Sequence, residues 1–324
     1  MKKIVAVVVT YNRIVLLQEC VAALQNQQTD DEESLQFDAL IVDNASTDGT
    51  VEWIRQRTTQ KFGTGTVYSL CLSENSGGAG GFYAGMKWAM EQGYDAIWIM
   101  DDDTIPQPDA LVQLLRGMDA AAQVKTGQKQ GETVGFVSST VLWTDGTPCR
   151  MNRQHEIPTT AEESLPQGIC PVDSATFVSL LFSREAVARM GLPLKDYFIW
   201  GDDKEYTLRI SGAFSCYHVK DSVVIHKMAT NAGSNIVMDE MSRVPRYYYA
   251  YRNDLCTARR RGAKEVLVYL AAFALNVCRV LLRSRDGKKE RIATMWHGLK
   301  DGITFSPEVE YASTITQYSN LENM

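Results

Sequence analysis

Three consecutive carboxylates, Asp101, Asp102 and Asp103, follow the apolar segment 97–100. Three adjacent like charges repel one another, so a fold that places them at the end of a strand needs a compensating cation. Carboxylate oxygens are hard ligands that suit Mg²⁺ or Mn²⁺, which makes a divalent metal the simplest compensation. Pro106 turns the chain after the carboxylates. A solvated acidic loop stays open as the alternative interpretation.

A second acidic cluster comes later in the chain, where Asp202, Asp203 and Glu205 follow Gly201. Paired carboxylates are a residue type that general acid or base catalysis uses, because such a group can exchange a proton with a reacting atom within hydrogen-bond reach. Acidic residues are also favoured in the first turn of a helix. A solvated helix start therefore stays open as the second interpretation of this cluster.

His226 ends the short strand-like segment 222–226. A histidine at a strand end is more often hydrogen-bonded within the fold than bound to a metal. Near a carboxylate cluster, however, an imidazole nitrogen is also a good metal ligand. We therefore treat His226 as a candidate third ligand, whereas His155 and His218 have no supporting context.

Two further segments have the residue types of a ligand-binding edge. Asp43 ends an apolar segment and can accept a hydrogen bond from a ligand, while Ser46 and Asp48 are good helix N-caps. The glycines of segment 77–81 allow close approach of the backbone to a ligand and supply amides at a helix start, which favours anions. The segment is neither Gly-x-Gly-x-x-Gly nor a P-loop, and a helix-packing turn explains its glycines nearly as well.

The elements that must position these side chains alternate between strand and helix. Continuous β-branched runs predict buried parallel strands, and helical spacing of apolar residues predicts helices. The expected strands are 4–9, 37–42, 67–72 and 95–100, and the expected helices are 14–26, 50–57 and 82–92. This alternation predicts an α/β fold with a mainly parallel central sheet and helices on both faces. In such sheets ligands bind at the carboxyl ends of strands, where Thr10, Asp43 and Asp101 lie.

After residue 116 the pattern becomes less regular. We expect strands over 134–142 and 222–226, a polar excursion over 145–170, mixed strand character over 172–182 and a helix from 183. The segment 247–261 combines three consecutive tyrosines, Tyr247 to Tyr249, with Arg252 and Asn253. It is either an acceptor or phosphate site or a helix with an aromatic core face.

The composition bounds the class of protein. With 324 residues, 45% hydrophobic and 22% charged, the chain is an ordinary globular one with room for one large domain or two smaller ones. A net charge of −6 gives no indication of a nucleic-acid partner. The seven cysteines contain no Cys-x-x-Cys pair, so neither a zinc ribbon nor a disulfide framework is expected, and reduced thiols fit the cytosol. The apolar start of the chain lacks a small-residue cleavage site, which predicts a buried first strand.

Taken together, the segments 7–13, 42–49, 75–81 and 100–103 resemble the GT-A glycosyltransferases of family 2, and the resemblance extends over roughly residues 3–260. The segments 75–82 and 198–206 are similar to the galactofuranosyltransferase branch and its rhamnosyltransferase relatives. The resemblance implies a GT-A, Rossmann-like catalytic domain over 1–245, with a nucleotide-sugar half to about 115 and an acceptor half from about 116. A C-terminal helical region over 246–324 would follow.

The resemblance implies a metal-dependent, inverting transfer of a sugar from a nucleotide sugar. The favoured donor is UDP-galactofuranose, and the expected acceptor is a glycan, lipid-linked, in bacterial surface-polysaccharide synthesis such as O-antigen assembly at the cell envelope. A rhamnosyltransferase or another hexosyltransferase that uses a dTDP- or UDP-sugar is the alternative within this class. A non-catalytic nucleotide-sugar-binding scaffold is the alternative outside it.

Carried over by position, the family roles give Asp101 and Asp103 as ligands of Mn²⁺ or Mg²⁺, with His226 completing the metal shell. The metal would neutralise the diphosphate leaving group. Asp203 would be the catalytic base, and Asp202 beside it would hold sugar hydroxyls.

The substrate-binding candidates are Thr10, Arg13, Asp43, Asn75, Gly78, Gly80, Asp102, Trp200 and Glu205. Of these, Thr10, Arg13 and Asp43 would hold the nucleotide, Arg13 by pairing with phosphate. Asp102 would contact the ribose or the sugar of the donor. Trp200 either stacks on a sugar ring or packs in the core, and the family often has Trp directly before the paired carboxylates, where this chain has Gly201.

The apolar segment 266–282 bears on location. Its uninterrupted run, 266–275, is shorter than the roughly 20 residues that a spanning helix needs. Asn276 and Arg279 interrupt it, and basic residues follow. This pattern predicts an interfacial helix near anionic lipid, while a buried helix that packs on the catalytic domain is the alternative. The expected location is the cytoplasm, with peripheral contact at the inner face of the membrane, and a homo-oligomer stays open.

Overall fold

The computed structural model describes residues 2–28, 36–58, 61–62, 65–123, 133–158 and 165–312. Residues 159–164 of the predicted polar excursion and 313–324 of the predicted C-terminal region lie outside the described residues.

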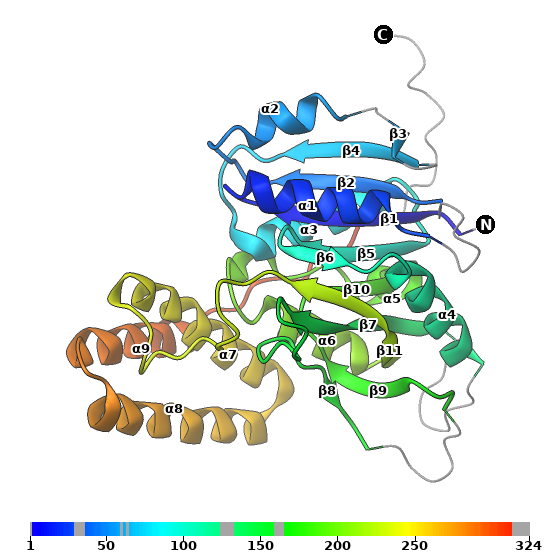
Figure 1. Cartoon of the computed structure of the whole chain (residues 1–324). Coiled ribbons are helices and arrows are strands. Elements are labelled where there is room, and N and C mark those ends of the chain that lie inside the picture. Colours follow the sequence, from blue (N-terminus) through cyan, green and yellow to red (C-terminus); the bar gives the residue numbers. More distant parts are fainter. Residues whose placement is uncertain are drawn as a thin grey trace.

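Parallel strands form the first half of the central sheet (Figure 1). They are β1 (Ile4–Thr10), β2 (Asp38–Asp43), β4 (Gly65–Cys71) and β5 (Ala96–Asp101), in the order β4-β2-β1-β5, with β3 (Lys61–Phe62) antiparallel to β4. The helices among them are α1 (Ile14–Gln25), α2 (Thr50–Arg55) and α3 (Gly77–Glu91). Every residue of β1 is buried, which explains its continuous apolar sequence up to Thr10.

The second half of the sheet is mixed. Strand β10 (Leu180–Ser183) runs antiparallel to β5 and to β7 (Val134–Trp143), and β7 runs parallel to β11 (Ser215–His226). The remaining strands are β9 (Ile169–Ser174), β8 (His155–Glu156) and β6 (Thr104–Pro106), and the remaining helical elements of this half are α4 (Ala110–Ala122), α5 (Arg184–Met190), η1 (Lys195–Tyr197) and α6 (Asp202–Ser211). The predicted α/β fold with a mainly parallel sheet is confirmed. The expected strand 222–226 is the end of the longer β11.

Apolar clusters cover both faces of the sheet. One cluster joins α1, α2 and α4 to one face around Trp98, and the other joins α3, α5 and α6 to the opposite face around Phe182. Burial of this much aliphatic and aromatic surface is the main favourable term in folding. The strand ends at the rim of the sheet are therefore held by a rigid scaffold.

Helix α3 begins at Gly77, earlier than the start at residue 82 that the sequence predicts. The glycine cluster is thus the first turn of the helix, not a turn before it. Gly77 has φ +73°, and a Cβ there would lie 1.9 Å from the carbonyl oxygen of Phe198. A Cβ at Gly81 would meet the Val9 side chain at 2.4 Å. These glycines let α3 approach β1 on one side and the segment before α6 on the other.

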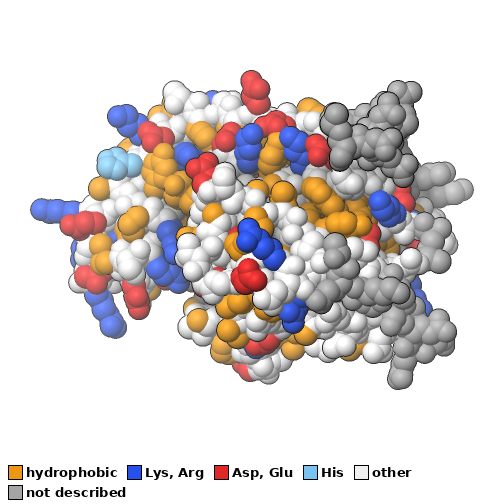
Figure 2. All heavy atoms as spheres, turned by 90° about the horizontal axis from the view of Figure 1, so that it is seen from above, with side chains coloured by type: hydrophobic (Ala, Val, Ile, Leu, Met, Phe, Trp, Pro, Cys, Tyr) orange, Lys and Arg blue, Asp and Glu red, His pale blue; other side chains and the backbone are white. Residues whose placement is uncertain are grey.

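The C-terminal helices form a separate group beside the sheet (Figure 1). They are η2 (Met241–Arg246), α7 (Tyr247–Arg261), α8 (Ala263–Arg283) and α9 (Lys288–Gly302). Their own apolar cluster includes Tyr251, Phe273 and Met295. In the view of Figure 1, α7 lies next to the sheet and α8 lies at the outer edge of the molecule. On the face shown in Figure 2, Lys and Arg side chains are interspersed with Asp and Glu, so no extended surface of one charge covers it.

Candidate active site

The carboxyl ends of three strands bring the first acidic cluster and the distant histidine together. In the pairing of β1 with β5, Val9 lies opposite Asp101, so Thr10 is next to the carboxylates. The chain then turns into β6, which pairs antiparallel with β11 so that Thr104 lies opposite His226. This short return strand explains how residues 103 and 226 become neighbours, because neither is local to the other in sequence.

Side-chain contacts tie the cluster together. His226 Nε2 lies 2.9 Å from Asp103 Oδ1, and Arg13 Nη1 donates to Asp103 Oδ2 at 2.8 Å. Thr10 Oγ1 donates to Asp102 Oδ2 at 2.7 Å, and Arg13 reaches Asp102 Oδ1 at 3.4 Å. One ligand atom from each of Asp101, Asp103 and His226 lies within 4.8 Å of the others. The predicted ligand set therefore converges, with Asp102 turned toward Thr10.

The charges of the cluster show the need for a cation. Burial and the Asp103 charge raise the pKa of Asp101, and burial raises the pKa of Asp102 to about 6. Burial opposes protonation of His226, but its hydrogen bond with Asp103 raises its pKa to about 10. His226 and Arg13 lower the pKa of Asp103 against the effect of burial. Positive charge is thus strongly favoured here, as expected where buried carboxylates converge.

The donor set fits Mn²⁺ or Mg²⁺. Two carboxylates and an imidazole are ligands that both ions accept. His226 Nδ1 donates to Asn152 Oδ1 at 2.8 Å, because a carbonyl oxygen can only accept, and this leaves Nε2 directed at Asp103. Asn152 Nδ2 in turn donates to Thr176 Oγ1 at 2.9 Å. Orientation of the imidazole through its other nitrogen is a common feature of metal sites.

The second acidic cluster forms the start of α6 and faces the same cavity. This cavity has a volume of about 360 Å³, and its lining includes Asp101, Asp103 and His226 together with Asp202 and Asp203. Pockets of this size suit a small-molecule ligand. Two acidic clusters that are far apart in the sequence therefore share one space.

Asp202 and Asp203 differ in their surroundings. Asp202 is buried, and burial together with the Asp203 charge raises its pKa well above the ordinary value. Asp203 is half-buried and its Oδ1 accepts from the Lys204 backbone N–H at 2.7 Å. Burial raises the pKa of Asp203 to about 6. Asp202 thus favours its protonated form, whereas Asp203 is ionised at neutral pH.

A strained turn precedes these carboxylates and α7 holds it in place. Phe198 and Trp200 have φ of +64° and +65°, values that cost energy in residues other than glycine. The buried side-chain amide of Asn253 donates to the carbonyl oxygens of Tyr197, Ile199 and Trp200 at 2.9, 3.2 and 2.8 Å. The Tyr- and Arg-rich segment 247–261 therefore supports the turn before α6 through Asn253.

We expect that Asn253→Ala lowers turnover and lowers the free energy of unfolding by about 1–3 kcal/mol, because buried carbonyl groups lose their donor. Thermal unfolding and nucleotide release from a donor sugar measure the two effects. Asn276→Ala is the matched control, since this half-buried amide on α8 interacts with the side chains of Arg279, at 3.3 Å, and Tyr251, and not with the carbonyls of the turn. Equal effects of the two substitutions would contradict a positioning role for Asn253.

Several predicted residues lie at the cavity and others lie behind it. The cavity is lined by Arg13, Gly78, Asp101, Asp103, Trp200, Asp202, Asp203 and His226 among the predicted residues. Trp200 also packs on Tyr247, with ring centroids 4.9 Å apart. Trp200 thus lines the cavity, as the stacking interpretation requires, and it packs on an aromatic neighbour, as the core interpretation requires. Thr10 and Asp102 lie directly behind this wall and contact Arg13 through Asp102.

The remaining predicted residues have partners within the fold. Asp43 is fully buried and accepts from the Ser46 backbone N–H, and Asn75 Oδ1 accepts from the Gly77 N–H at 2.9 Å. A Cβ at Gly80 would meet Ser76, which indicates a packing role. The structure does not bring Glu205 to the cavity, because both of its carboxylate oxygens pair with Arg209, at 2.9 and 3.0 Å.

Some cavity residues were missed by the sequence reasoning. Asn152 lies in the polar excursion, where nothing marks it as a partner of His226. Arg243 and Arg246 also line the cavity and come from η2. Their spacing of three residues just before the aromatic segment is a signal that could have found them. Together with Arg13 they place three guanidinium groups around the acidic clusters.

Comparison with known proteins places this geometry in a family. The profile of the family described as Glycosyl transferase family 2 matches residues 5–183. An undecaprenyl-phosphate mannosyltransferase of Micrococcus luteus is 31% identical over 119 residues, covering 37% of this chain and 45% of that protein. The galactofuranosyltransferase GlfT1 of Mycobacterium tuberculosis is 26% identical over 204 residues, covering 60% and 64%. The chain thus spans less than two thirds of the length of these curated relatives.

Solved structures show the same fold at low identity. The mannosyltransferase PcManGT of Pyrobaculum calidifontis, in complex with GDP-Man and Mn²⁺, matches with a TM-score of 0.53 and 17% identity, covering 86% of this chain and 72% of that one. S. aureus TarS 1-349 in complex with UDP matches with a TM-score of 0.51 and 14% identity, covering 94% and 72%. With its fold, its converging carboxylates and a profile match over more than half of its length, the chain belongs to glycosyltransferase family 2.

Proposed function

We propose that this glycosyltransferase is metal-dependent and inverting, and that it transfers galactofuranose from UDP-galactofuranose to a lipid-linked glycan in bacterial surface-polysaccharide synthesis. The observation that carries the proposal is the single cavity in which a metal-type donor set faces a second pair of carboxylates. One cluster suits the diphosphate end of a donor, and the other suits the attacking hydroxyl of an acceptor.

The donor end requires charge neutralisation. Asp101, Asp103 and His226 would hold Mn²⁺ or Mg²⁺, which supplies Lewis-acid stabilisation of the departing diphosphate. Arg13, half-exposed beside Asp103, would pair with a phosphate oxygen. Arg243 and Arg246 lie far from Arg13 in the sequence but line the same cavity. They would add positive charge near the phosphates. Asp102 and Thr10 keep Arg13 in position.

The acceptor end requires a base and a group that orients the sugar. Asp203 is ionised at neutral pH and would take the proton of the attacking hydroxyl. Burial and the Asp203 charge raise the pKa of Asp202, which favours its protonated form, and the protonated carboxyl would donate a hydrogen bond to a sugar hydroxyl. We infer that the acceptor hydroxyl attacks from the side opposite the leaving group, and a transfer of this kind inverts the configuration of the donor sugar. The support is that the two clusters line one cavity.

The choice of donor rests on similarity. GlfT1 is named a galactofuranosyltransferase, and it matches over a larger share of this chain than the mannosyltransferase of Micrococcus luteus. Against this, the mannosyltransferase is more similar within its shorter match, so a hexosyltransferase with another donor is the second candidate.

We expect nucleotide release to be fastest with UDP-galactofuranose when the purified protein is incubated with an acceptor glycolipid fraction and a panel of donors. The panel contains UDP-galactofuranose, UDP-galactopyranose, dTDP-rhamnose and GDP-mannose, each with Mn²⁺ and with Mg²⁺. Preference for dTDP-rhamnose or GDP-mannose would move the activity to the second candidate. Binding of nucleotide without release from any donor would favour a non-catalytic scaffold.

The proposed setting is the cytoplasmic side of the membrane. All seven cysteines are free thiols in the structure, as expected for a reducing compartment. We further propose that residues 1–245 act as the catalytic domain and that the region from 246 supports it. The supporting observation is the separate apolar cluster of the C-terminal helices, which reaches the site through Trp200.

A further inference from the structure

Helix α8 presents an apolar face that no described element covers. Only Tyr269, Phe273 and Val280 of this helix are buried, on the side toward α7 and α9. Six large apolar side chains are exposed, namely Leu267, Val268, Leu270, Leu275, Leu281 and Leu282. These six side chains are here called the α8 outer face. Four of them, Leu267, Val268, Leu275 and Leu282, lie on the side of the helix opposite the buried residues, and Leu270 and Leu281 lie on one flank of that side. Leu282 is 82% exposed and Leu267 is 67% exposed, so the face is open along its whole length.

The size of the α8 outer face calls for an occupant. Isolated exposed leucines are common, but an apolar stripe over residues 267–282, about four helical turns, marks a binding surface. By length and composition α8 could also cross a membrane. Its inner side, however, is fixed to the folded domain, where Tyr269 Oη donates to the Tyr251 carbonyl at 3.0 Å and Phe273 packs on Tyr251 and Trp296. A helix attached along one side lies on a surface and does not pass through it.

The charges around α8 indicate which kind of surface the α8 outer face binds. Residues 263–291 contain seven basic and three acidic residues, whereas the whole chain has a net charge of −6. The basic residues gather at the C-terminal end of the outer face, with Arg283, Arg285, Lys288 and Lys289, whereas Lys264 at the other end is followed by Glu265. In a second copy with a parallel helix two basic ends would meet, and with an antiparallel helix each basic end would meet an end without net negative charge. A layer of anionic lipid headgroups complements the basic end.

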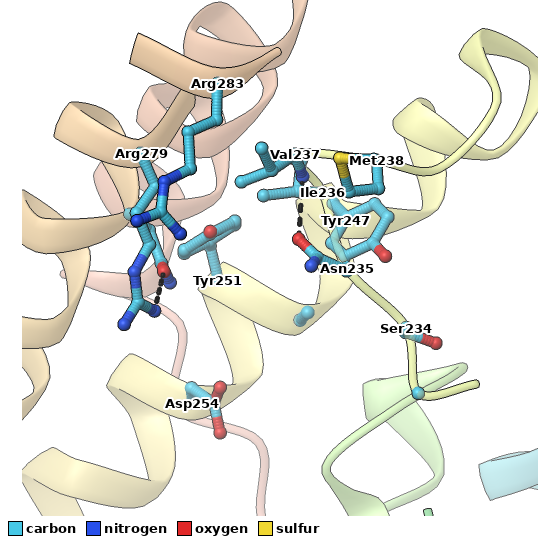
Figure 3. Close-up of a pocket in the computed structure, with 13 residues that line it drawn as sticks. Ser234, Asn235, Ile236, Val237, Met238, Tyr247, Tyr251, Asp254, Arg279 and Arg283 are labelled. Atoms are coloured by element: carbon cyan, nitrogen blue, oxygen red, sulfur yellow. Dashed lines mark hydrogen bonds between the residues drawn. The ribbon is translucent and has the colours of Figure 1, made fainter. Parts of the chain in front are cut away.

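A cavity opens at the flank of the same helix. It has a volume of about 660 Å³ and lies between α8, α7 and the segment 233–238 (Figure 3). Figure 3 shows Arg279 and Arg283 reaching into it from α8, with Tyr251 and Asp254 on the side of α7. Two guanidinium groups at the edge of an apolar face form a suitable place for the phosphate of a lipid headgroup.

This cavity adjoins the candidate active site. Tyr247 lines it, and Tyr247 packs directly on Trp200, which lines the catalytic cavity. Asp254 lines it as well and pairs with Lys204, the residue after Asp203, at 3.2 Å. The contact between Tyr247 and Trp200 therefore joins the wall of this cavity to the wall of the catalytic cavity.

We propose that the α8 outer face docks on an anionic membrane surface and that Arg279 and Arg283 receive a lipid phosphate in the cavity beside it. The inference goes beyond the proposed function, because it concerns vesicle binding and does not depend on which sugar is transferred.

Flotation of the full chain with liposomes tests the proposal. We expect binding to vesicles of phosphatidylglycerol and phosphatidylcholine at low salt, and much weaker binding to pure phosphatidylcholine. Leu267→Ser with Leu275→Ser and Leu282→Ser should reduce the partition coefficient at least about 10-fold, because each exposed leucine loses its apolar contact with the bilayer. Val15→Ser, at a 65% exposed position on α1, is the matched control and should bind like the unmodified protein.

A second pair of variants tests the charges. Arg279→Gln with Arg283→Gln should lower binding to anionic vesicles by about 5-fold for each charge removed, and Lys87→Gln with Lys300→Gln should have a small effect. Circular dichroism and UDP binding show that each variant is folded, so a loss of vesicle binding is separate from a loss of catalysis. Binding that is unchanged in the leucine variant would overturn the proposal. So would a dimer that dissociates on the leucine substitutions while the unmodified protein leaves vesicles unbound.

Discussion

Asp101→Asn and Asp103→Asn are each expected to lower turnover by at least about 10²-fold, because a bound cation contributes several kcal/mol to stabilising the charge of the leaving group. Both carboxylates lie within 4.8 Å of His226, and Arg13 and His226 both contact Asp103. Activity measured against Mn²⁺ and Mg²⁺ concentration, with and without a chelator, gives the effect. Asp119→Asn, an exposed acid paired with Lys2, is the control.

The two substitutions should differ in their effect on stability when no metal is added. Asp101 is repelled by Asp103, so Asp101→Asn should leave the unfolding midpoint unchanged or raised. Asp103→Asn removes the buried partner of His226 and should cost about 3–5 kcal/mol. Because the folded-state pKa of His226 is raised to about 10, this pair stabilises fully below a pH of about 6.5 and loses its effect as the pH rises toward 10. Equal midpoints at pH 6, or full activity in excess chelator, would contradict the assignment of these residues.

Much of the fold followed from sequence patterns that depend on local structure. The buried run of β1 and the helical spacing of α1 predict elements whose ends agree closely with the structure. The start of α3 was misplaced because glycine is a poor helix former. Here the close approach of Phe198 to Gly77 outweighs that cost. A propensity cannot reveal a contact with a residue that lies far along the chain.

The same distinction applies to the candidate site, where some residues follow from local sequence patterns and others depend on tertiary contacts. Asp101 and Asp103 stand at the end of a strand that the sequence predicts. A helix start at Asp203 is only the alternative interpretation of the second cluster, and the link between the two clusters comes from the family resemblance. Asn152 and Asn253 could not be found, since each acts through hydrogen bonds to groups that only the tertiary structure brings near. Glu205 has the residue type of a site residue, but Arg209 one helical turn later takes both of its oxygens.

Asp203→Asn is expected to lower kcat by about 10²–10⁴-fold, the usual contribution of a general base, while UDP binding in the presence of Mn²⁺ changes little. The amide cannot take the proton of the acceptor hydroxyl, but it keeps the size of the carboxylate. Asp203 contacts its own helix start through the Lys204 N–H, whereas Thr10 and Arg13 contact Asp102 and Asp103. Calorimetric titration with UDP and steady-state kinetics with a saturating donor separate the two quantities.

The pH dependence of kcat tests whether Asp203 acts as the base. With the pKa of Asp203 raised to about 6, the unmodified enzyme should lose kcat about tenfold per pH unit as the pH falls below 6, because the base becomes protonated. The residual activity of Asp203→Asn should lack this limb. Asp202→Asn is the matched substitution one residue away. Because Asp202 already favours its protonated form, the amide preserves a donor at that position and the limb near pH 6 should remain. If Asp203→Asn keeps normal turnover while Asp202→Asn loses it together with the acid limb, the base is Asp202, and the half-buried carboxylate only orients the acceptor.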